Sequence, residues 1–364
     1  MLITNQNPHN KSIMLGVIGA PNVGKSSLVN YLMGLDLSSV TQKPQTTRNQ
    51  FHCIFTIDNV EVVLVDTPGF HKSTQEMNIR MNQEAREGGD GADVNLLLLD
   101  LSRDIEAQLK EFQNIFLKNT LHNYKIWPVF TKSDLLGEHN EVNQIVKVKY
   151  IDLCKKIIGN IEEYFVVSSQ NGDGVHQLIG VICDKAPAGP HLYNRGQMSN
   201  KNERFFAAEY IREQAFNILR EEVPYELAVL ISGYESIDED SNSDSYNDNN
   251  NDSNNDSYND EHKNEENNEN KNSSENEKAP LVARINATIL VNRQSQRAIV
   301  IGNKGSTIKE IGSRARVKIE EMVGGRVFLG LHVKVCPKWF KNNTILEQIG
   351  LSRAPDSKRV WRKR

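Results

Sequence analysis

The sequence predicts a doubly wound α/β domain followed by a smaller α+β domain. Short apolar runs, of the kind that form buried strands, alternate with helical spacings between residues 13 and 186. A stretch with two prolines and two glycines follows at 187–202, and we expect it to be a linker. With 364 residues, the chain is long enough for two or three domains.

The elements of the first domain follow from the spacing of its apolar residues. The runs 51–57 and 61–65 flank a turn and predict a hairpin. Pro128 is an awkward strand member, because proline cannot donate a ladder hydrogen bond. The polar region 38–50 predicts a loop, and another polar, glycine-containing region precedes Val94. We expect strands at 13–18, 51–57, 61–65, 94–100, 126–130 and 164–167, and helices at 28–33, 105–117, 142–158 and 175–186.

The second domain is interrupted by an acidic segment. A helix is expected at 205–220 and strands at 225–232 and 281–291. Between these strands, residues 236–279 hold seven Asp, seven Glu and only three Lys, a net charge of −11. Such a segment cannot bury enough apolar surface to order itself, so we expect disorder. The two strands then form a hairpin with an overgrown loop, which costs little because closure entropy rises slowly with length.

Charge is unevenly distributed along the chain. The whole chain carries −4, yet residues 280–364 hold 18 Lys and Arg against five Asp and Glu, a net charge of +13. A field of that sign favours RNA, DNA or an anionic membrane surface, although an ordinary solvated basic face is the simpler interpretation. The four cysteines lie far apart, which indicates a reducing compartment rather than disulfides or a zinc site. No apolar run approaches the ~20 residues of a membrane span, and the N-terminus does not look like a secretory signal.

A phosphate-binding pattern, Gly-x-x-x-x-Gly-Lys-Ser, joins the first strand to the first helix. A glycine-rich turn at a helix N-terminus directs backbone N–H groups toward a phosphate. Lys25 would reach the β- and γ-phosphates of a nucleoside triphosphate, and Ser26 would ligate Mg²⁺. The alternative is a chance glycine turn. The nine residues are Gly19, Ala20, Pro21, Asn22, Val23, Gly24, Lys25, Ser26 and Ser27.

Further polar residues follow the ends of other predicted strands, where doubly wound sheets bind ligands. Asp66 can hold Mg²⁺ through water, and the N–H of Gly69 can meet the γ-phosphate. Thr47, or its neighbour Thr46, could complete the metal shell, although a surface threonine is the plain alternative. Asp66 belongs to the string Asp66-Thr67-Pro68-Gly69.

Two strings predict recognition of guanine. They are Thr131-Lys132-Ser133-Asp134 and Ser168-Ser169-Gln170, and either alone could be a polar strand-to-loop turn. A carboxylate at Asp134 accepts from guanine N1–H and the exocyclic amine, a pair that adenine lacks. The stem of Lys132 can lie over the base plane. The second string would give a backbone N–H to the guanine oxygen.

With these motifs, residues 12–186 resemble the small GTPase domain of translation-factor-type GTPases. The usual base motif is Asn-Lys-x-Asp, so Thr131 is a departure, and we expect weaker tethering to the P-loop with guanine specificity retained. Phe70 stands where Ras-like proteins carry a water-orienting glutamine. The resemblance implies that Asn22 ligates K⁺, that hydrolysis is slow and faster in K⁺, and that the catalytic residues are Asn22, Lys25, Thr47 and Gly69. A turn-capping role for Asn22 is the alternative.

The string Ile301-Gly302-Asn303-Lys304-Gly305 places a Gly-x-x-Gly loop between two helix-like segments. It resembles the loop of a KH domain, which clamps about four single-stranded nucleotides. Lys304 and Lys309 supply positive charge. Lys338 and Trp339 could add a base-stacking site, although a core or docking role for the tryptophan is equally expected.

A GTPase domain followed by a KH domain of the bacterial type resembles the Era family. The resemblance implies a GTPase of small-subunit ribosome assembly that binds GTP, GDP and Mg²⁺ and the 3′ end of small-subunit rRNA. Its partners would be that RNA and a 30S-type precursor. Supporting strings are Gln45-Thr46-Thr47-Arg48, Gly189-Pro190-His191, Glu203-Arg204-Phe205, Ile211-Arg212-Glu213 and Val223-Pro224-Tyr225. We divide the chain into an N-terminus (1–11), a GTPase domain (12–186), a linker (187–202), a type II KH domain (203–350) interrupted at 236–279, and a basic tail (351–364).

Three other interpretations remain at this point. They are an RNA-binding adaptor with a degenerate nucleotide domain, a tRNA-modification GTPase relative, and a P-loop kinase. Intact Lys25, Ser26 and Asp66 disfavour the adaptor, and Asp134 disfavours the kinase. We expect a cytoplasmic monomer, with peripheral membrane attachment or an organellar setting as alternatives.

Overall fold

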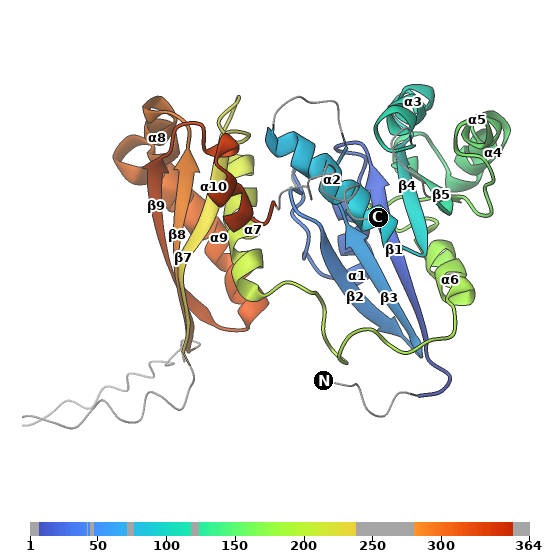
Figure 1. The fold of residues 1–364 in the computed structure, drawn as a ribbon, viewed down its shortest axis with the longest axis horizontal. Helices are drawn as coiled ribbons and strands as arrows, with labels where there is room; N and C mark the ends of the chain where they lie inside the picture. The colour runs from blue at the N-terminus through green and yellow to red at the C-terminus, as the bar shows by residue number, and fades with distance from the viewer. Residues whose placement is uncertain are drawn as a thin grey trace, which may run out of the picture.

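The protein folds into two units, each built around one β-sheet (Figure 1). The structure is a computed structural model that describes residues 7–41, 43, 47–70, 76–117, 124–237 and 280–351. The predicted fold class is confirmed: a mixed α/β sheet comes first, and a three-stranded sheet with helices follows. The predicted acidic insert beyond residue 237, the basic tail beyond residue 351, and Thr46 lie outside the described residues.

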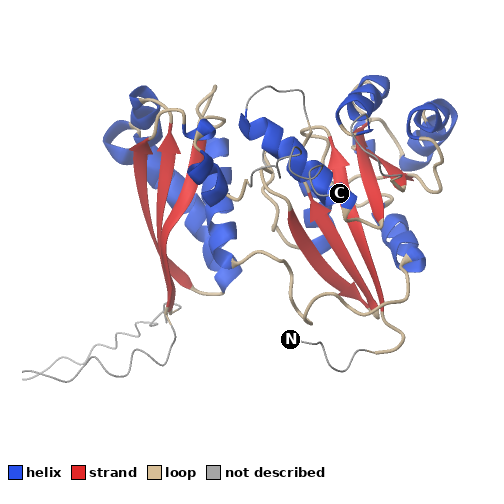
Figure 2. Cartoon of the chain, in the orientation of Figure 1, coloured by secondary structure: helices blue, strands red, loops and turns tan. Residues whose placement is uncertain are grey.

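Six strands form the first sheet in the order β2-β3-β1-β4-β5-β6. β2 is antiparallel to β3, as the predicted hairpin requires, and the other neighbours are parallel. Helices lie on both sides of this sheet (Figure 2). The strands are β1 (Lys11–Gly19), β2 (Phe51–Ile57), β3 (Val60–Asp66), β4 (Val94–Asp100), β5 (Ile126–Thr131) and β6 (Phe165–Val166). The helices are α1 (Lys25–Met33), α2 (Glu76–Asp90), α3 (Ile105–Ile115), α4 (His139–Lys149), α5 (Ile151–Ile158) and α6 (Val175–Lys185).

The polar motifs gather at one edge of this sheet. Gly19 ends β1, Asp66 ends β3, Asp100 ends β4 and Thr131 ends β5. These four strands are parallel, so their carboxyl ends meet at the same edge. The apolar strand residues behind this edge are almost fully buried, which fixes the positions of the polar residues that follow them.

Helix α2 occupies a region in which the sequence predicted no element. Most of its residues are polar, and Gly88 and Gly89 near its end are weak helix formers. Both glycines are needed for close packing, since a Cβ would lie 2.7 Å from Thr67 Cγ2 at the first and 2.7 Å from Phe116 Cζ at the second. Tertiary packing therefore overrides local propensity here.

The structure divides one predicted helix of the first unit and explains the proline within β5. The helix expected at 142–158 is divided at Tyr150 into α4 and α5. Pro128 is tolerated within β5 because β6 is very short and pairs only with Val129 and Phe130. The missing N–H of Pro128 thus falls outside this pairing.

The second unit contains the sheet β7-β8-β9. β7 and β8 are antiparallel and pair as far as Ser236 and Ala283, so they form the predicted hairpin across the insert. β9 runs parallel to β8 and was not predicted from the sequence. The strands are β7 (Leu227–Ser236), β8 (Leu281–Val291) and β9 (Arg326–Val335). The helices are α7 (Glu203–Ile218), α8 (Gln294–Ile301), α9 (Ser306–Val323) and α10 (Asn343–Gln348), with short 3₁₀ turns η4 (Asn303–Gly305) and η5 (Trp339–Lys341).

The two units are held together by more than the linker. Met77 and Met81 of α2 belong to one apolar cluster with Trp339, Leu346 and Leu351 of the second unit. Figure 1 shows α10 turned toward α2 of the first unit. Within the described ranges, no helix is both long and apolar enough to cross a bilayer.

Candidate functional site

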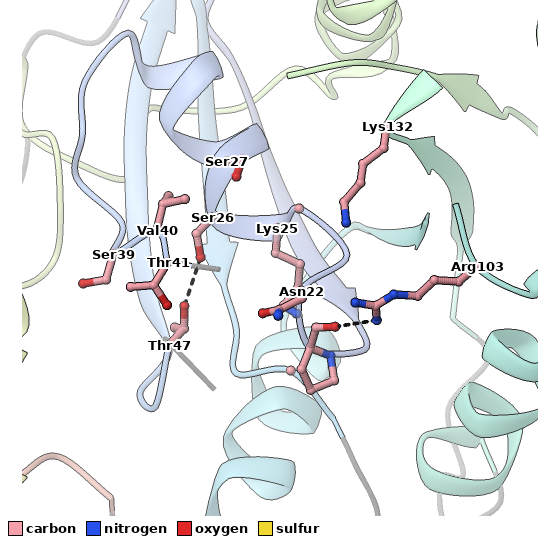
Figure 3. A pocket seen from close by; sticks show the side chains of 13 residues that line it. Asn22, Lys25, Ser26, Ser27, Ser39, Val40, Thr41, Thr47, Arg103 and Lys132 are labelled. Atoms are coloured by element: carbon pink, nitrogen blue, oxygen red, sulfur yellow. Dashed lines mark hydrogen bonds between the residues drawn. The ribbon is translucent and has the colours of Figure 1, made fainter. Parts of the chain in front are cut away.

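The P-loop surrounds a cavity of about 330 Å³ at the carboxyl edge of the first sheet (Figure 3). Asn22 and Gly24 have left-handed φ angles of 61° and 96°, which give the loop its tight path into α1. A Cβ on Gly19 would lie 2.9 Å from Leu98 O, so only glycine fits there. The cavity is lined by Pro21, Asn22, Gly24, Lys25, Ser26, Ser27, Ser39, Val40, Thr41, Thr47, Gly69, Arg103 and Lys132.

Lys25 is buried at the floor of this cavity. Its ammonium group donates hydrogen bonds to the carbonyl oxygens of Gly19 at 3.0 Å and Ala20 at 2.9 Å. Burial lowers the pKa of Lys25 to about 8, while the charge of Asp66 opposes this shift and Arg103 adds to it. An anion bound in the cavity would therefore be attracted by the partly desolvated ammonium group of Lys25.

Three oxygen-bearing side chains converge where the predicted metal would lie. The hydroxyls of Ser26 and Thr47 are 3.1 Å apart, and each lies 3.5 Å from Asp66 Oδ2. The other carboxylate oxygen, Asp66 Oδ1, is buried without a hydrogen-bond partner among the described residues. Burial raises the pKa of Asp66 to about 6, against the charge of Lys25 and the hydrogen bonds it accepts. Hard oxygen ligands of this kind suit Mg²⁺.

Thr131 is tethered to the P-loop by a direct hydrogen bond. Its hydroxyl donates a hydrogen bond to Val23 O at 2.6 Å, and Leu99 O lies at 3.3 Å. The end of β5 lies close enough to the P-loop for this short side chain to reach it, and a tether weaker than that of an asparagine stays a prediction. The neighbouring Lys132 Nζ lies 2.6 Å from Asp100 Oδ2.

The remaining residues that the sequence predicts to read guanine also meet. Asp134 lies in the 3₁₀ turn η2 (Ser133–Leu135), and Ser168 Oγ donates to its carboxylate at 2.5 Å. The same Ser168 Oγ accepts from the backbone N–H of Gln170 at 3.1 Å. Ser168 thus orients the carboxylate and the loop, and the Gln170 N–H already has a partner within the loop.

The residues after Asp66 take distinct positions. Thr67 Oγ1 donates to Val17 O at 2.6 Å, which fixes the turn before Pro68. A Cβ on Gly69 would lie 2.9 Å from Pro21 N and Cα, so glycine permits the close approach to the P-loop. The ring of Phe70 is 2% exposed and packs on Phe112 and Phe116. Phe70 therefore faces the core rather than the cavity.

Sequence reasoning missed four residues that line the cavity. Ser39, Val40 and Thr41 come from a polar loop without a recognisable motif. Arg103 donates to Pro21 O at 3.0 Å, and its Nε lies 3.2 Å from Asp100 Oδ2. A charged residue shortly after a buried strand was the one available signal for Arg103.

The Gly-x-x-Gly loop joins α8 to α9. Gly302, Lys304 and Gly305 have φ angles of 74°, 49° and 80°, and a Cβ on Gly302 would lie 2.2 Å from Thr307 Oγ1. Asn303 and Lys304 are exposed at the tip of this loop. The predicted RNA-binding residues on or beside this turn are Ile301, Gly302, Asn303, Lys304, Gly305 and Lys309.

Known proteins resemble the chain over nearly all of its length. Residues 14–132 match the family described as 50S ribosome-binding GTPase, and residues 270–340 match the KH domain family. GTPase Era of Thermosipho melanesiensis is 33% identical over 94% of this chain and 98% of its own length. GTPase Era of Thermotoga maritima is 32% identical over 94% of this chain and 97% of its own length. The chain belongs to the Era family of GTPases.

Two solved Era structures share the fold of both units. One is a crystal structure of Era in complex with MgGDPNP and nucleotides 1506–1542 of 16S ribosomal RNA. It is 27% identical, has a TM-score of 0.77, and is matched over 95% of this chain and 100% of its own. The other is a single-residue variant of Aquifex aeolicus Era bound to GDP and AlF4⁻, with 26% identity, a TM-score of 0.75, and coverage of 94% and 100%.

Trp339 is not available for base stacking. Its side chain is fully buried, and its indole N–H donates to Glu226 O at 2.8 Å. The guanidinium carbon of Arg48 lies 5.8 Å from its ring centroid. Trp339 therefore docks the two units of this Era-family protein, and we withdraw it as an RNA contact. Lys338 is exposed, and its backbone N–H donates to Asn292 Oδ1. Asn292 precedes α8, whereas the Gly-x-x-Gly loop follows it, so Lys338 lies at the other end of this helix from the loop.

Arg48 connects the two units directly beside the predicted metal site. It follows Thr47 in sequence, and only 2% of it is exposed. It donates to Leu227 O at 2.7 Å and to Tyr225 O at 3.3 Å, both in the second unit. The residue after Thr47 is therefore in direct contact with the start of β7.

Proposed function

We propose that the protein is a GTP-hydrolysing, RNA-binding switch that acts in assembly of the small ribosomal subunit. The observation that carries the proposal is the insertion of Arg48 into the second unit, directly after the metal-site residue Thr47. This contact links a nucleotide-sensitive loop to the unit that bears the Gly-x-x-Gly turn. The match to an RNA-bound Era structure over 95% of the chain supports the identity of the RNA.

The nucleotide is GTP or GDP with Mg²⁺. Lys25 and the N–H groups of the P-loop and Gly69 hold the phosphates, and Ser26, Thr47 and Asp66 hold the metal, Asp66 through water. Mg²⁺ would neutralise charge on the phosphates during hydrolysis. Asp134 reads the guanine edge with Ser168 holding its carboxylate, and Lys132 covers the base.

Ser169 is the candidate for the N–H that binds the guanine oxygen. The N–H of the following residue, Gln170, is directed to Ser168 Oγ. In the predicted string, Ser168 therefore orients the carboxylate of Asp134, Ser169 contacts the base, and Gln170 belongs to the loop.

Hydrolysis is slow and stimulated by K⁺. Phe70 is buried in the core and supplies no group to orient water, so the site requires another source of transition-state charge. Asn22 lines the cavity and supplies an amide oxygen for a monovalent cation. Rates measured in KCl and NaCl test this step, and equal rates with Asn22→Ala unchanged would contradict it.

The RNA is a single strand from the 3′ end of small-subunit rRNA. The loop 302–305 brings its backbone close to a sugar–phosphate chain, and Lys304 and Lys309 provide positive charge. We propose that the protein binds it as a monomer in the cytoplasm, in a 30S-type precursor. The four cysteines are free, which suits a reducing compartment. The alternatives to this location are peripheral membrane attachment and an organellar setting.

One experiment tests the whole proposal. Hydrolysis of GTP and of ATP is measured with and without an oligonucleotide of the small-subunit 3′ end, and binding of that oligonucleotide is measured in parallel. We expect hydrolysis of GTP only, and at least tenfold weaker RNA binding in Lys304→Asp than in the control Lys147→Asp, an exposed site on α4. Preference for ATP, or absence of RNA binding, would overturn the proposal.

A further inference from the structure

The peptide between Pro21 and Asn22 leads into the non-glycine residue of the P-loop that has a left-handed backbone. Asn22 has a φ of 61°, in the left-handed region that side-chain-bearing residues adopt at a cost. Such a conformation persists only where surrounding contacts hold it. Both residues line the nucleotide cavity, so the orientation of this peptide decides what the loop presents to a phosphate.

Side chains from three parts of the chain hold the carbonyl oxygens of the loop. Lys25 holds those of Gly19 and Ala20, and Thr131 holds that of Val23. Arg103 holds a further one, Pro21 O, through Nη1 at 3.0 Å. Figure 3 shows Arg103 reaching the P-loop from beside α3, with Asn22 between it and Thr47.

A trans peptide directs its C=O and the following N–H in opposite directions. Because Arg103 holds Pro21 O, the N–H of Asn22 is directed away from Arg103. A backbone N–H that is turned into a phosphate cradle in this way costs no reorganisation when the substrate binds.

Arg103 is itself anchored. Its Nε lies 3.2 Å from Asp100 Oδ2, and the side chain of Asp100 is fully buried at the end of β4. The same oxygen accepts from Lys132 Nζ at 2.6 Å, and Ser102 Oγ holds the other oxygen at 2.6 Å. One buried carboxylate therefore connects the P-loop, through Arg103, to the base-covering Lys132.

We propose that Arg103 is a positioning residue for GTP hydrolysis, which fixes the Pro21–Asn22 peptide so that the Asn22 N–H donates to the phosphate chain. The inference rests on the GTPase function proposed above. Asp100 serves as its anchor. Arg103 makes two contacts at once, which a guanidinium can do from different nitrogens and an ammonium does less well.

The test compares Arg103→Ala and Arg103→Lys with the wild type and with Lys110→Ala. Lys110 is an exposed lysine of α3 that pairs with Glu106 on the same helix, so its removal makes the same charge change away from the cavity. Steady-state GTP hydrolysis gives kcat, and a fluorescent GTP analogue gives Kd. We expect kcat to fall by on the order of 10- to 100-fold in Arg103→Ala, with Kd changed less than about fivefold, and an intermediate value in Arg103→Lys.

The pattern separates positioning from general destabilisation. A stability role alone would lower the Tm and leave kcat of the folded fraction unchanged, and that result would overturn the inference. A kcat equal to wild type in Arg103→Ala, beside an active wild type, would also overturn it and leave the proposed GTPase function intact. A wild type that hydrolyses no GTP would overturn the proposed function and this inference with it.

Discussion

The Thr131 hydroxyl donates a 2.6 Å hydrogen bond to Val23 O across 108 residues of sequence. The bond joins the first residue of the string predicted to read guanine to the P-loop. Val23 and Thr131 are both buried, so the carbonyl has no access to water if the hydroxyl is lost. A threonine thus provides a tether at the position where related GTPases carry asparagine.

Removing this hydroxyl should weaken nucleotide binding. Thr131→Val keeps the shape of the side chain but leaves Val23 O buried and unpaired, at a cost of about 1–3 kcal/mol. We expect about tenfold weaker GDP binding by fluorescence titration and a lower free energy of unfolding in urea. Thr131→Asn should restore both values, since an amide can donate the same bond. Unchanged affinity in Thr131→Val would show that the tether is dispensable.

Arg48→Ala should uncouple RNA binding from the nucleotide state. The substitution leaves Leu227 O and Tyr225 O without their donor and removes the cation from the face of Trp339. We expect the unfolding free energy to fall by about 2–4 kcal/mol. We also expect RNA affinities with GDP and with a non-hydrolysable GTP analogue to become equal.

The control for Arg48 is Lys201→Ala, which removes a cation from the ring of Phe205 where the linker meets α7. It should leave the difference between the two nucleotide states intact. A difference that survives in Arg48→Ala would contradict the proposed route between the sites.

Much of the fold could be predicted from the sequence because its signals are local. The apolar strands and the hairpin across the insert follow from the periodicity of their own residues. α2 could not be predicted, because Gly88 and Gly89 look like loop residues until their packing against Thr67 and Phe116 is known. β9 and α10 were missed for want of any pattern that we recognised.

The candidate site divides in the same way. The P-loop, the string that begins at Asp66 and the Gly-x-x-Gly turn are short contiguous motifs, so their chemistry can be recognised from the sequence alone. The role of Arg103 and the buried position of Trp339 depend on contacts between distant segments, and no local sequence motif predicts them. The sequence predicted a core or docking role for Trp339 on an equal footing with base stacking and could not decide between them.

Replacing the acidic insert should tighten RNA binding. β7 and β8 pair up to Ser236 and Ala283, and Ile237 N–H donates to Val282 O, so an Asn-Gly turn can replace residues 238–279. The deleted segment carries −11 and would repel a polyanion from the basic second unit. We expect several-fold tighter RNA binding at low salt, a smaller gain in high salt, and an unfolding free energy raised by no more than about 3 kcal/mol.

A second variant separates the charge of the insert from its length. It keeps the insert and replaces its Asp and Glu by Asn and Gln. This variant should bind RNA as tightly as the deletion if charge is responsible. Unchanged affinity in both variants would exclude the insert as a competitor of RNA.

The contribution of Asp100 to stability should depend on pH in a defined direction. Burial alone would raise the pKa of Asp100, but the hydrogen bonds from Lys132 and Ser102 outweigh it and hold the pKa below its ordinary value of 3.8. A carboxyl with a lowered pKa in the folded state stabilises the protein above its unfolded pKa and loses that effect as pH falls toward the folded pKa. The free energy of unfolding of the wild type should therefore be larger than that of Asp100→Asn by about 2 kcal/mol at pH 7. The difference should shrink below about pH 4 in urea unfolding, and a difference that stays constant to about pH 3 would refute the assignment.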